Sequence, residues 1–567
     1  MEDRSIEKVN GPYVRLALKV VLGLLIFIGL IWGGHFAVVR LNVRRLLNQA
    51  HASFEKRDDR SALIAAQRAF ELDLKNVEAC RIVADVLERQ GAPAAIEWRR
   101  RVLNLQPDSV NDRLTLARTA LRVGQIATAE DAIEKIAPQA EKLATFQELR
   151  GELALANGNA AAAQAQFSEA VRIEPQNKRY QMNLAVAQLS SGSGEARNAA
   201  TETVGRFLDD PELQKTAARA LRDYGLRERD TRMAFENAER LAKFPNPELQ
   251  DRLAYLDMLR QILHPDYAAR LIEVQEEAAG DPVKAYALLI WLSSSRQEEL
   301  ALEWAKQLPP ATRNKWPVAG ALAECYGAGK NWSELEAFCR TTDWGEMDYL
   351  RHASLSRALR EEQKTTDAEE EWSAACKAVG SDGNKIRTLQ STVARWGWKN
   401  ESVELLWQLS KDGAHAIAAL NTLYGYYAAA GDTPNLYRVA ARLAELQPND
   451  PRTMNNVAQF ALLLGVDKTR AARLAQNVYE QEPANAAYAS TFAFALYTQG
   501  QVAEALDVFR KLDDADLRNP AIAAYYGIVL VAAGEKEKAR EYLELAKSAA
   551  LLPEEKELLA RAIAAAG

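Results

Sequence analysis

Residues 146–177 read FQELRGELALANGNAAAAQAQFSEAVRIEPQN, and this stretch predicts two short helices joined by a tight turn. The turn is the Asn-Gly-Asn sequence at 157–159, because glycine and asparagine tolerate the left-handed backbone conformation that ends helices. Pro175 ends the second helix, since proline lacks an amide proton and clashes with the preceding helical turn. The stretch is therefore predicted to be a helical hairpin.

Small side chains mark the faces on which these two helices would meet. Gly151 and Ala154 belong to the first helix, and the second helix offers Ala163 and Ala170. Phe167 lies between those two alanines at spacings of four and three residues, which puts all three on one helix face. A single hairpin cannot bury that face, so neighbouring copies must stack to form a continuous core.

Two residue types recur along the chain with the period of this hairpin. Glycines occupy positions 91, 124, 158, 192 and 225, and later 397, 431, 465, 500 and 534. Prolines follow nearly the same spacing at 107, 138, 175, 211, 245 and 282, and later at 448, 483, 520 and 553. A shared period near 34 residues in a constant phase indicates a helical-repeat protein.

The repeated pattern resembles the tetratricopeptide repeat family. A later hairpin has the same kinds of residue at matching positions, namely Ala493, Leu496, Gly500, Ala505 and Phe509. The resemblance covers about nine-tenths of the chain and implies an all-α fold, a right-handed solenoid of about 15 helical hairpins. Between 250 and 415 the pattern is degenerate and rich in tryptophan, with Gln363 and Ser294 at glycine positions.

A membrane anchor is predicted before the repeats, over residues 16–40. Residues 20–39 read VVLGLLIFIGLIWGGHFAVV without a charged side chain, and about 20 helical residues cross a hydrocarbon core of roughly 30 Å. A cleaved signal peptide and a buried helix are the alternatives. The predicted segments are thus a tail at 1–15, an anchor at 16–40, N-terminal repeats at 41–249, degenerate repeats at 250–415, C-terminal repeats at 416–553 and a capping helix at 554–567.

Basic residues flank both ends of the predicted anchor, so the positive-inside rule is nearly balanced. A short tail kept inside, with the rest exported, is the commoner arrangement. We therefore expect a single-pass protein of a bacterial inner membrane with an exported solenoid, in preference to a cytoplasmic one.

Motif searches predict no catalytic, cofactor or metal-binding residues. The sequence has neither a G-x-x-x-x-G-K-[ST] phosphate loop nor an H-E-x-x-H zinc motif. The histidines are isolated from one another, at His35, His51, His264, His352 and His415. The formal net charge is −6, which disfavours a protein that wraps nucleic acid. We therefore expect a protein that is not an enzyme and does not bind nucleic acid.

Four cysteines in 567 residues exclude a fold built on disulfides. Cys325 and Cys339 are 14 residues apart on the two helices of one predicted hairpin. A disulfide between them is geometrically possible in an oxidising compartment. Burial as free, apolar residues is the favoured alternative.

Polar residues on first helices are candidate partner-binding residues, because the family resemblance places these helices on the inner, concave surface. Asn183, Asn421, Asn455 and Asn456 could hydrogen-bond a peptide backbone there. Arg452 with Asn455 and Asn456 partly matches the carboxylate clamp of some family members, although no lysine is in register. Solvated polar residues are the alternative interpretation.

Tryptophans are concentrated in the degenerate segment. Trp396 and Trp398 flank Gly397 at a predicted turn, where an exposed aromatic residue can anchor a partner. Packing inside the core is the alternative, because large aromatic side chains are mostly buried.

The sequence as a whole predicts a membrane-anchored scaffold or adaptor that binds protein or peptide partners. Assembly of envelope or secretion-type complexes is the expected setting, and the oligomeric state stays open. The alternative function is a regulator or enzyme accessory subunit with a site in the degenerate segment, at 290–410. That alternative predicts a compact pocket with converging polar groups.

Overall fold

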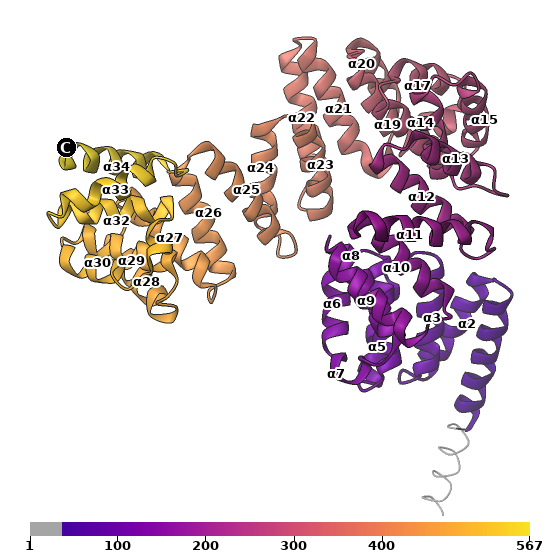
Figure 1. Cartoon of the computed structure of the whole chain (residues 1–567). Helices are drawn as coiled ribbons and strands as arrows, with labels where there is room; N and C mark the ends of the chain where they lie inside the picture. The colour runs from indigo at the N-terminus through magenta and orange to yellow at the C-terminus, as the bar shows by residue number, and fades with distance from the viewer. Residues whose placement is uncertain (1–36) are drawn as a thin grey trace, which may run out of the picture. The chain divides into compact units, whose positions relative to one another are not determined.

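A computed structural model describes residues 37–567, and all regular structure in that range is helical (Figure 1). The helices follow one another as fifteen successive pairs and a last single helix, with short helices in some of the connections. The chain divides after Val274 into two compact units. An all-α array of helix pairs with this period fits the tetratricopeptide-type fold that the sequence resembles.

Seven helix pairs make up the first unit. They are 37–55 and α2 (Asp59–Leu72), α3 (Val77–Arg89) and α4 (Ala95–Leu105), α5 (Val110–Arg122) and α6 (Ile126–Glu134), α8 (Ala144–Ala156) and α9 (Ala160–Ile173), α10 (Lys178–Ser191) and α11 (Gly194–Arg206), α12 (Gln214–Glu228) and α13 (Thr231–Ala242), and α14 (Leu249–Gln261) and α15 (Tyr267–Ala279). Helix α15 ends beyond the boundary. Two short helices lie in connections, α7 (Ala137–Ala140) and η1 (Phe207–Asp209).

Eight further pairs belong to the second unit. They are α16 (Pro282–Ser294) and α17 (Glu298–Ala305), α19 (Val318–Ala328) and α20 (Trp332–Thr341), α21 (Asp348–Glu361) and α22 (Thr365–Val379), α23 (Gly383–Arg395) and α24 (Lys399–Leu409), α25 (Ala416–Ala430) and α26 (Thr433–Leu446), α27 (Pro451–Leu464) and α28 (Lys468–Gln481), α29 (Ala486–Thr498) and α30 (Val502–Phe509), and α32 (Pro520–Ala532) and α33 (Lys536–Ala546). The remaining helices are α18 (Pro310–Arg313), η2 (Gly345–Met347), α31 (Asp514–Leu517) and the final α34 (Pro553–Ala566).

The predicted membrane anchor requires a correction. Over residues 37–567, each helix is either too short or too polar to span a bilayer. The helix at 37–55, for example, carries Arg40, Arg44 and Arg45. Residues 16–36 of the predicted anchor lie outside the described residues. The predictions of a transmembrane helix, of a membrane-anchored type and of a single-pass inner-membrane location are contradicted by this finding. The predicted division into repeat segments, with borders at 249 and 415, stays a prediction.

Left-handed backbone conformations close the turns of the hairpins. They recur at intervals of 33 to 35 residues, apart from one double interval, at Arg57, Gly91, Gly124, Gly158, Arg229, Leu263, Arg296, Lys330, Gln363, Gly397, Gly431, Gly465, Gly500 and Gly534. The prediction that Gln363 occupies a glycine position is therefore confirmed. The one for Ser294 is wrong by two residues, because Ser294 ends α16 and Arg296 forms the turn.

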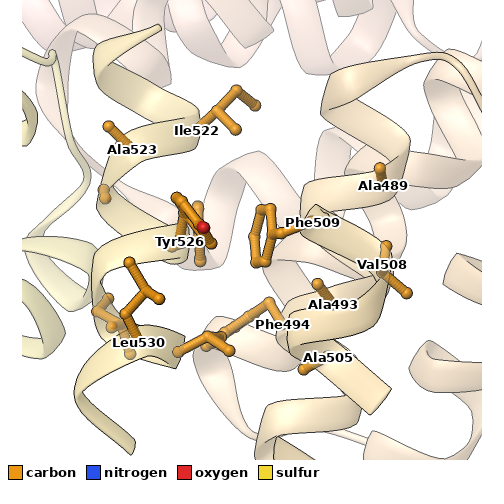
Figure 2. Close-up of a cluster of buried hydrophobic side chains, with 14 of the residues drawn as sticks. Ala489, Ala493, Phe494, Ala505, Val508, Phe509, Ile522, Ala523, Tyr526 and Leu530 are labelled. Atoms are coloured by element: carbon orange, nitrogen blue, oxygen red, sulfur yellow. The ribbon is translucent and has the colours of Figure 1, made fainter. Parts of the chain in front are cut away.

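Close packing within hairpins follows the predicted small residues. A β-carbon on Gly151 would lie 2.4 Å from a ring carbon of Phe167, which is buried. At the C-terminal end, Phe509 of α30 packs against Tyr526 of α32, with ring centroids 5.1 Å apart (Figure 2). Alanines of α29 lie beside them, and Figure 2 shows Ala489 and Ala493 on that helix. The core thus continues from the hairpin α29–α30 into α32.

Candidate functional site

Six side chains of the second unit form a partly exposed group that we call the Arg–Trp cluster: Trp332, Arg357, Arg360, Trp372, Trp396 and Trp398. They come from α20, α21, α22 and the turn between α23 and α24. The cluster lies inside the degenerate segment. Its four indoles are all partly buried.

Two arginines of α21 stack on these indoles. The guanidinium of Arg357 lies 4.8 Å from the ring centroid of Trp396 and 5.3 Å from that of Trp332. The guanidinium of Arg360 lies 3.8 Å from the ring centroid of Trp398. All three distances are within the range in which a cation is attracted to the face of an aromatic ring.

The local backbone explains why two of the indoles meet. Trp396 ends α23, Trp398 precedes α24, and Gly397 between them has φ of 80°. This sharp reversal brings the two ring centroids to 5.4 Å, with the rings nearly perpendicular. Gly327 of α19 makes room for Arg357, because a β-carbon at Gly327 would lie 2.7 Å from Nη1 of that arginine.

The carboxylate of Glu324 contacts three side chains at one edge of the Arg–Trp cluster. Glu324 of α19 accepts a hydrogen bond from Nε1 of Trp396 at 3.3 Å. Its oxygens also lie 3.7 Å from Nη1 of Arg357 and 3.5 Å from Nη2 of Arg395. Burial lowers the pKa of the Arg357 guanidinium, and the nearby Glu324 charge partly offsets that effect. The Glu324 carboxylate therefore lies close to two guanidiniums, and the charge of Glu361 also acts on Arg357.

The arginine side chains at this edge of the cluster differ in their exposure to solvent. The side chain of Arg395 is 68% exposed, whereas that of Arg357 is mostly buried. Arg360 is held by Glu401, with Nη1 and Oε1 2.5 Å apart. The arginines of the Arg–Trp cluster are thus held in place by their neighbours, and the solvent-facing Arg395 lies beside the cluster. Whether Trp396 and Trp398 bind a partner stays a prediction.

The predicted asparagine residues belong to both units of the chain. In the first unit, Nδ2 of Asn183 donates to Oε1 of Glu148 at 3.2 Å, and Nε of Arg179 lies 2.7 Å from the same atom. In the second unit, Asn421 is exposed on α25. Asn183 is thus engaged within its own unit.

The residues of the predicted partial carboxylate clamp differ in their exposure to solvent. The side chain of Arg452 is 82% exposed and lies 3.5 Å from Asp450, whereas Asn455 is buried between helices. The Oδ1 atom of Asn455 accepts no hydrogen bond from any described residue. Asn456 on the next position is partly exposed. Binding of a partner by these three residues stays a prediction.

Sequence reasoning missed a groove between two second helices, α24 and α26. It has a volume of about 870 Å³ and is lined by residues that include Trp407, Lys411, Arg438 and Glu445. The guanidinium of Arg438 lies 4.0 Å from the ring centroid of Trp407. Trp407 and Arg438 are 31 residues apart, close to one repeat, and this spacing is the signal that could have revealed the pair.

The cysteines are free thiols in the structure. Cys325 and Cys339 are buried, and burial raises the pKa of each to about 12. The Sγ–H of Cys325 points at the carbonyl oxygen of Leu289, 3.8 Å away. The pair therefore follows the free, buried alternative rather than the disulfide. Within residues 37–567, no three acidic, histidine or cysteine side chains are grouped as metal ligands.

Comparisons with known proteins add similar folds. No protein-family profile matches the chain, and no curated protein matches it. A MamA structure is 18% identical with a TM-score of 0.26, covering 31% of this chain and 94% of that chain. The Cut9–Hcn1 hetero-tetramer of the APC/C is 11% identical with a TM-score of 0.29, covering 92% and 96%. PilF of Pseudomonas aeruginosa is 12% identical with a TM-score of 0.26, covering 43% and 95%. Scores this low carry no argument, so the fold assignment rests on the helix pairs themselves.

Proposed function

We propose that this protein is an interaction scaffold that holds protein partners in multiprotein complexes. The observation that carries the proposal is the Arg–Trp cluster. Arginine and tryptophan are the residue types that dominate binding energy in protein interfaces, above all where a rigid base is partly desolvated. Here Arg357 is fixed between two indoles, while Arg395 reaches into solvent beside them.

The preferred partner segment is one that carries a carboxylate. The side chain of Arg395 is 68% exposed, so it is accessible to an incoming acidic side chain. The partly exposed faces of Trp396 and Trp398 would bury apolar surface of the same segment. Concave-surface binding through Asn421 or Arg452 is a second proposal, supported only by the exposure of those two side chains.

The alternative function, a regulator or accessory subunit, places its site in the same segment at 290–410. Helix pairs continue through that segment from α16 to α24. This continuity favours a binding surface over a compact pocket with converging polar groups. We therefore prefer a scaffold to a catalytic or accessory role.

Affinity capture with a matched pair of variants tests the proposal. The double variant Arg395→Glu/Trp396→Ala removes the exposed arginine and one indole, whereas Arg232→Glu changes a charge on α13 that is more exposed still, at 88% against 68%. We expect partners recovered with the original chain and with Arg232→Glu to be reduced at least tenfold with the double variant. Equal recovery by all three chains, with unchanged circular dichroism, would contradict the role of the cluster.

A further inference from the structure

The beginning of the last helix, α34, reaches helices far upstream in the chain. The carboxylate of Glu554 accepts a hydrogen bond from Oγ1 of Thr433 at 2.5 Å, across 121 residues. The next carboxylate, Glu555, accepts one from Nε2 of Gln459 at 3.1 Å, across 96 residues, and one from the Tyr525 hydroxyl. The first turn of α34 therefore contacts α26, α27 and α32 of the same unit.

These contacts form a built binding pocket for a carboxylate. Glu555 is only 7% exposed, and a buried carboxylate is stable only when donors surround it. Two donors from other helices do so, Gln459 and Tyr525, and the Leu552 N–H at 2.8 Å adds a third from the N-cap of α34 itself. Burial and the Glu555 charge together raise the pKa of Tyr525 well above its ordinary value, which keeps the phenol protonated as a donor.

The residues next to these glutamates are fitted to their surroundings as well. Gly431, at the end of α25, faces Pro553, since a β-carbon there would lie 3.4 Å from Cδ of the proline. Leu552 packs against the core cluster that contains Leu420, Leu423 and Phe460, whereas Leu551 belongs to the C-terminal core. Each residue from Leu551 to Glu555 thus has its own contact, as in a docked peptide.

Covering the end of the array does not require these contacts. The buried side chains of α34 beyond its first turn, Leu559 and Ala562, belong to the C-terminal core with α32 and α33, as expected of a cap. The first turn instead extends back to α26 and α27, two or more hairpins before the end. The long-range contacts of Glu554 and Glu555 are polar and specific, which is typical of recognition rather than of capping.

We propose that α25, α26, α27 and α32 carry a docking site for the start of an acidic helix, and that α34 of this chain occupies it. The ligand has an apolar residue, a proline and two glutamates in its first turn, as in Leu552–Glu555. A partner helix of this chemistry binds the same site when α34 is released. The site is separate from the Arg–Trp cluster and stands or falls independently of it.

A cleavable version of the full chain tests the proposal. A protease site inserted at Ala549–Ala550, between α33 and α34, converts the covalent helix into a bound fragment after cleavage. A fluorescent peptide of residues 551–567 then exchanges with that fragment, and anisotropy reports its binding. Unlabelled peptides compete with it: the original sequence, Glu555→Ala, and Glu557→Ala as the control, since Glu557 is exposed and paired only with Arg561.

We expect the original and Glu557→Ala peptides to compete equally, and Glu555→Ala to compete at least tenfold less well, because hydrogen bonds to a charged group are lost. Tyr525→Phe and Gln459→Ala in the chain should weaken the original peptide in the same way. Equal competition by all three peptides would overturn the proposal, because affinity would then come from the capping face alone. Failure of the peptide to bind the folded, cleaved chain would overturn it too.

A second measurement covers the case in which cleavage unfolds the chain. Hydrogen exchange of the intact chain compares Glu555→Ala with Glu557→Ala. We expect faster exchange at the end of α25 and in α27 for Glu555→Ala only. The absence of any difference at those helices would show that the first turn of α34 is not bound there.

Discussion

Gly151 and Gly327 each make room for one large neighbour. Gly151 lets the Phe167 ring approach the first helix of its hairpin, and Gly327 admits the guanidinium of Arg357. Neither contact requires an unusual backbone, since only the missing β-carbon matters. At the scale of single residues, these small side chains decide which large ones can be buried.

Gly151→Ala should destabilise the protein by about 1–2 kcal/mol. Overpacking against Phe167 costs about 1–3 kcal/mol, and the better helix propensity of alanine returns up to about 1 kcal/mol. Gly205→Ala on α11 is the control, because no atom lies within 4 Å of its added β-carbon and the helix gains stability. Urea unfolding of both variants measures the difference, and a stabilised Gly151→Ala would contradict the close packing.

The thiols of Cys325 and Cys339 should resist alkylation at pH 8. Their pKa of about 12 leaves roughly one thiolate in 10,000, and only the thiolate reacts. In the unfolded chain the thiol has a pKa near 9, below its pKa of about 12 in the folded protein. The free energy of unfolding therefore falls as the pH rises from about 9 to 12. Timed iodoacetamide labelling with mass spectrometry checks the first point, and Cys376, with its pKa of about 11, should react sooner.

At the scale of the hairpin, the turn geometry persists where glycine does not. Lys364 N–H donates to Leu359 O at 2.8 Å after Gln363, just as Asn159 N–H donates to Ala154 O at 2.8 Å after Gly158. A left-handed conformation costs a non-glycine residue about 1–2 kcal/mol. The packing of neighbouring hairpins therefore maintains these turns against a local preference.

Leu263→Gly should stabilise the protein by about 0.5–1 kcal/mol. The glycine relieves the left-handed strain at φ of 53° but adds about 0.5–1 kcal/mol of unfolded-chain entropy. Little burial is lost, because Leu263 is 89% exposed. Leu226→Gly, within helix α12, is the control and should destabilise by about 1 kcal/mol. Thermal unfolding distinguishes the two, and a destabilised Leu263→Gly would refute the strain argument.

This persistence explains what sequence reasoning could and could not predict. Glycine and proline spacing predicted the hairpin at 146–177, whereas Gly225 of the same series lies within α12 and Arg229 forms the turn there. Between 250 and 415 the turn is enforced by packing, so residue types no longer mark it, and Arg296 was missed in favour of Ser294. The Arg–Trp cluster was found in part, because Trp396 and Trp398 flank a glycine. Arg357 and Glu324 are 39 and 72 residues away from Trp396, and only the stacked hairpins bring them together.

At the scale of the whole molecule, stability is a sum over neighbouring hairpins. Within the second unit, α29 packs on α28 and on α32, and the core of α29–α34 contains no residue of the first unit. In such arrays a local defect spreads only to adjacent repeats.

Phe509→Ala should therefore loosen only part of the chain. Removing this buried ring costs about 3–5 kcal/mol, and its neighbours are Tyr526 and the alanines of α29. Hydrogen-exchange mass spectrometry should show faster exchange across α27–α34 and unchanged exchange across α3–α9. The exposed Arg510→Ala should change neither region. A chain-wide increase in exchange for Phe509→Ala would point to a single cooperative unit instead.

The hydrogen bond from Trp396 to Glu324 joins hairpins that are not sequence neighbours, since α21 and α22 lie between them. An array held together only by contacts between neighbouring helix pairs bends evenly along its length. A contact that skips one helix pair stiffens that part of the array against both bending and stretching. Under tension, the helix pairs from α19 to α23 should keep their curvature while those on either side extend. A partner bound beside the Trp396–Glu324 contact would therefore meet the same surface when the rest of the array is stretched.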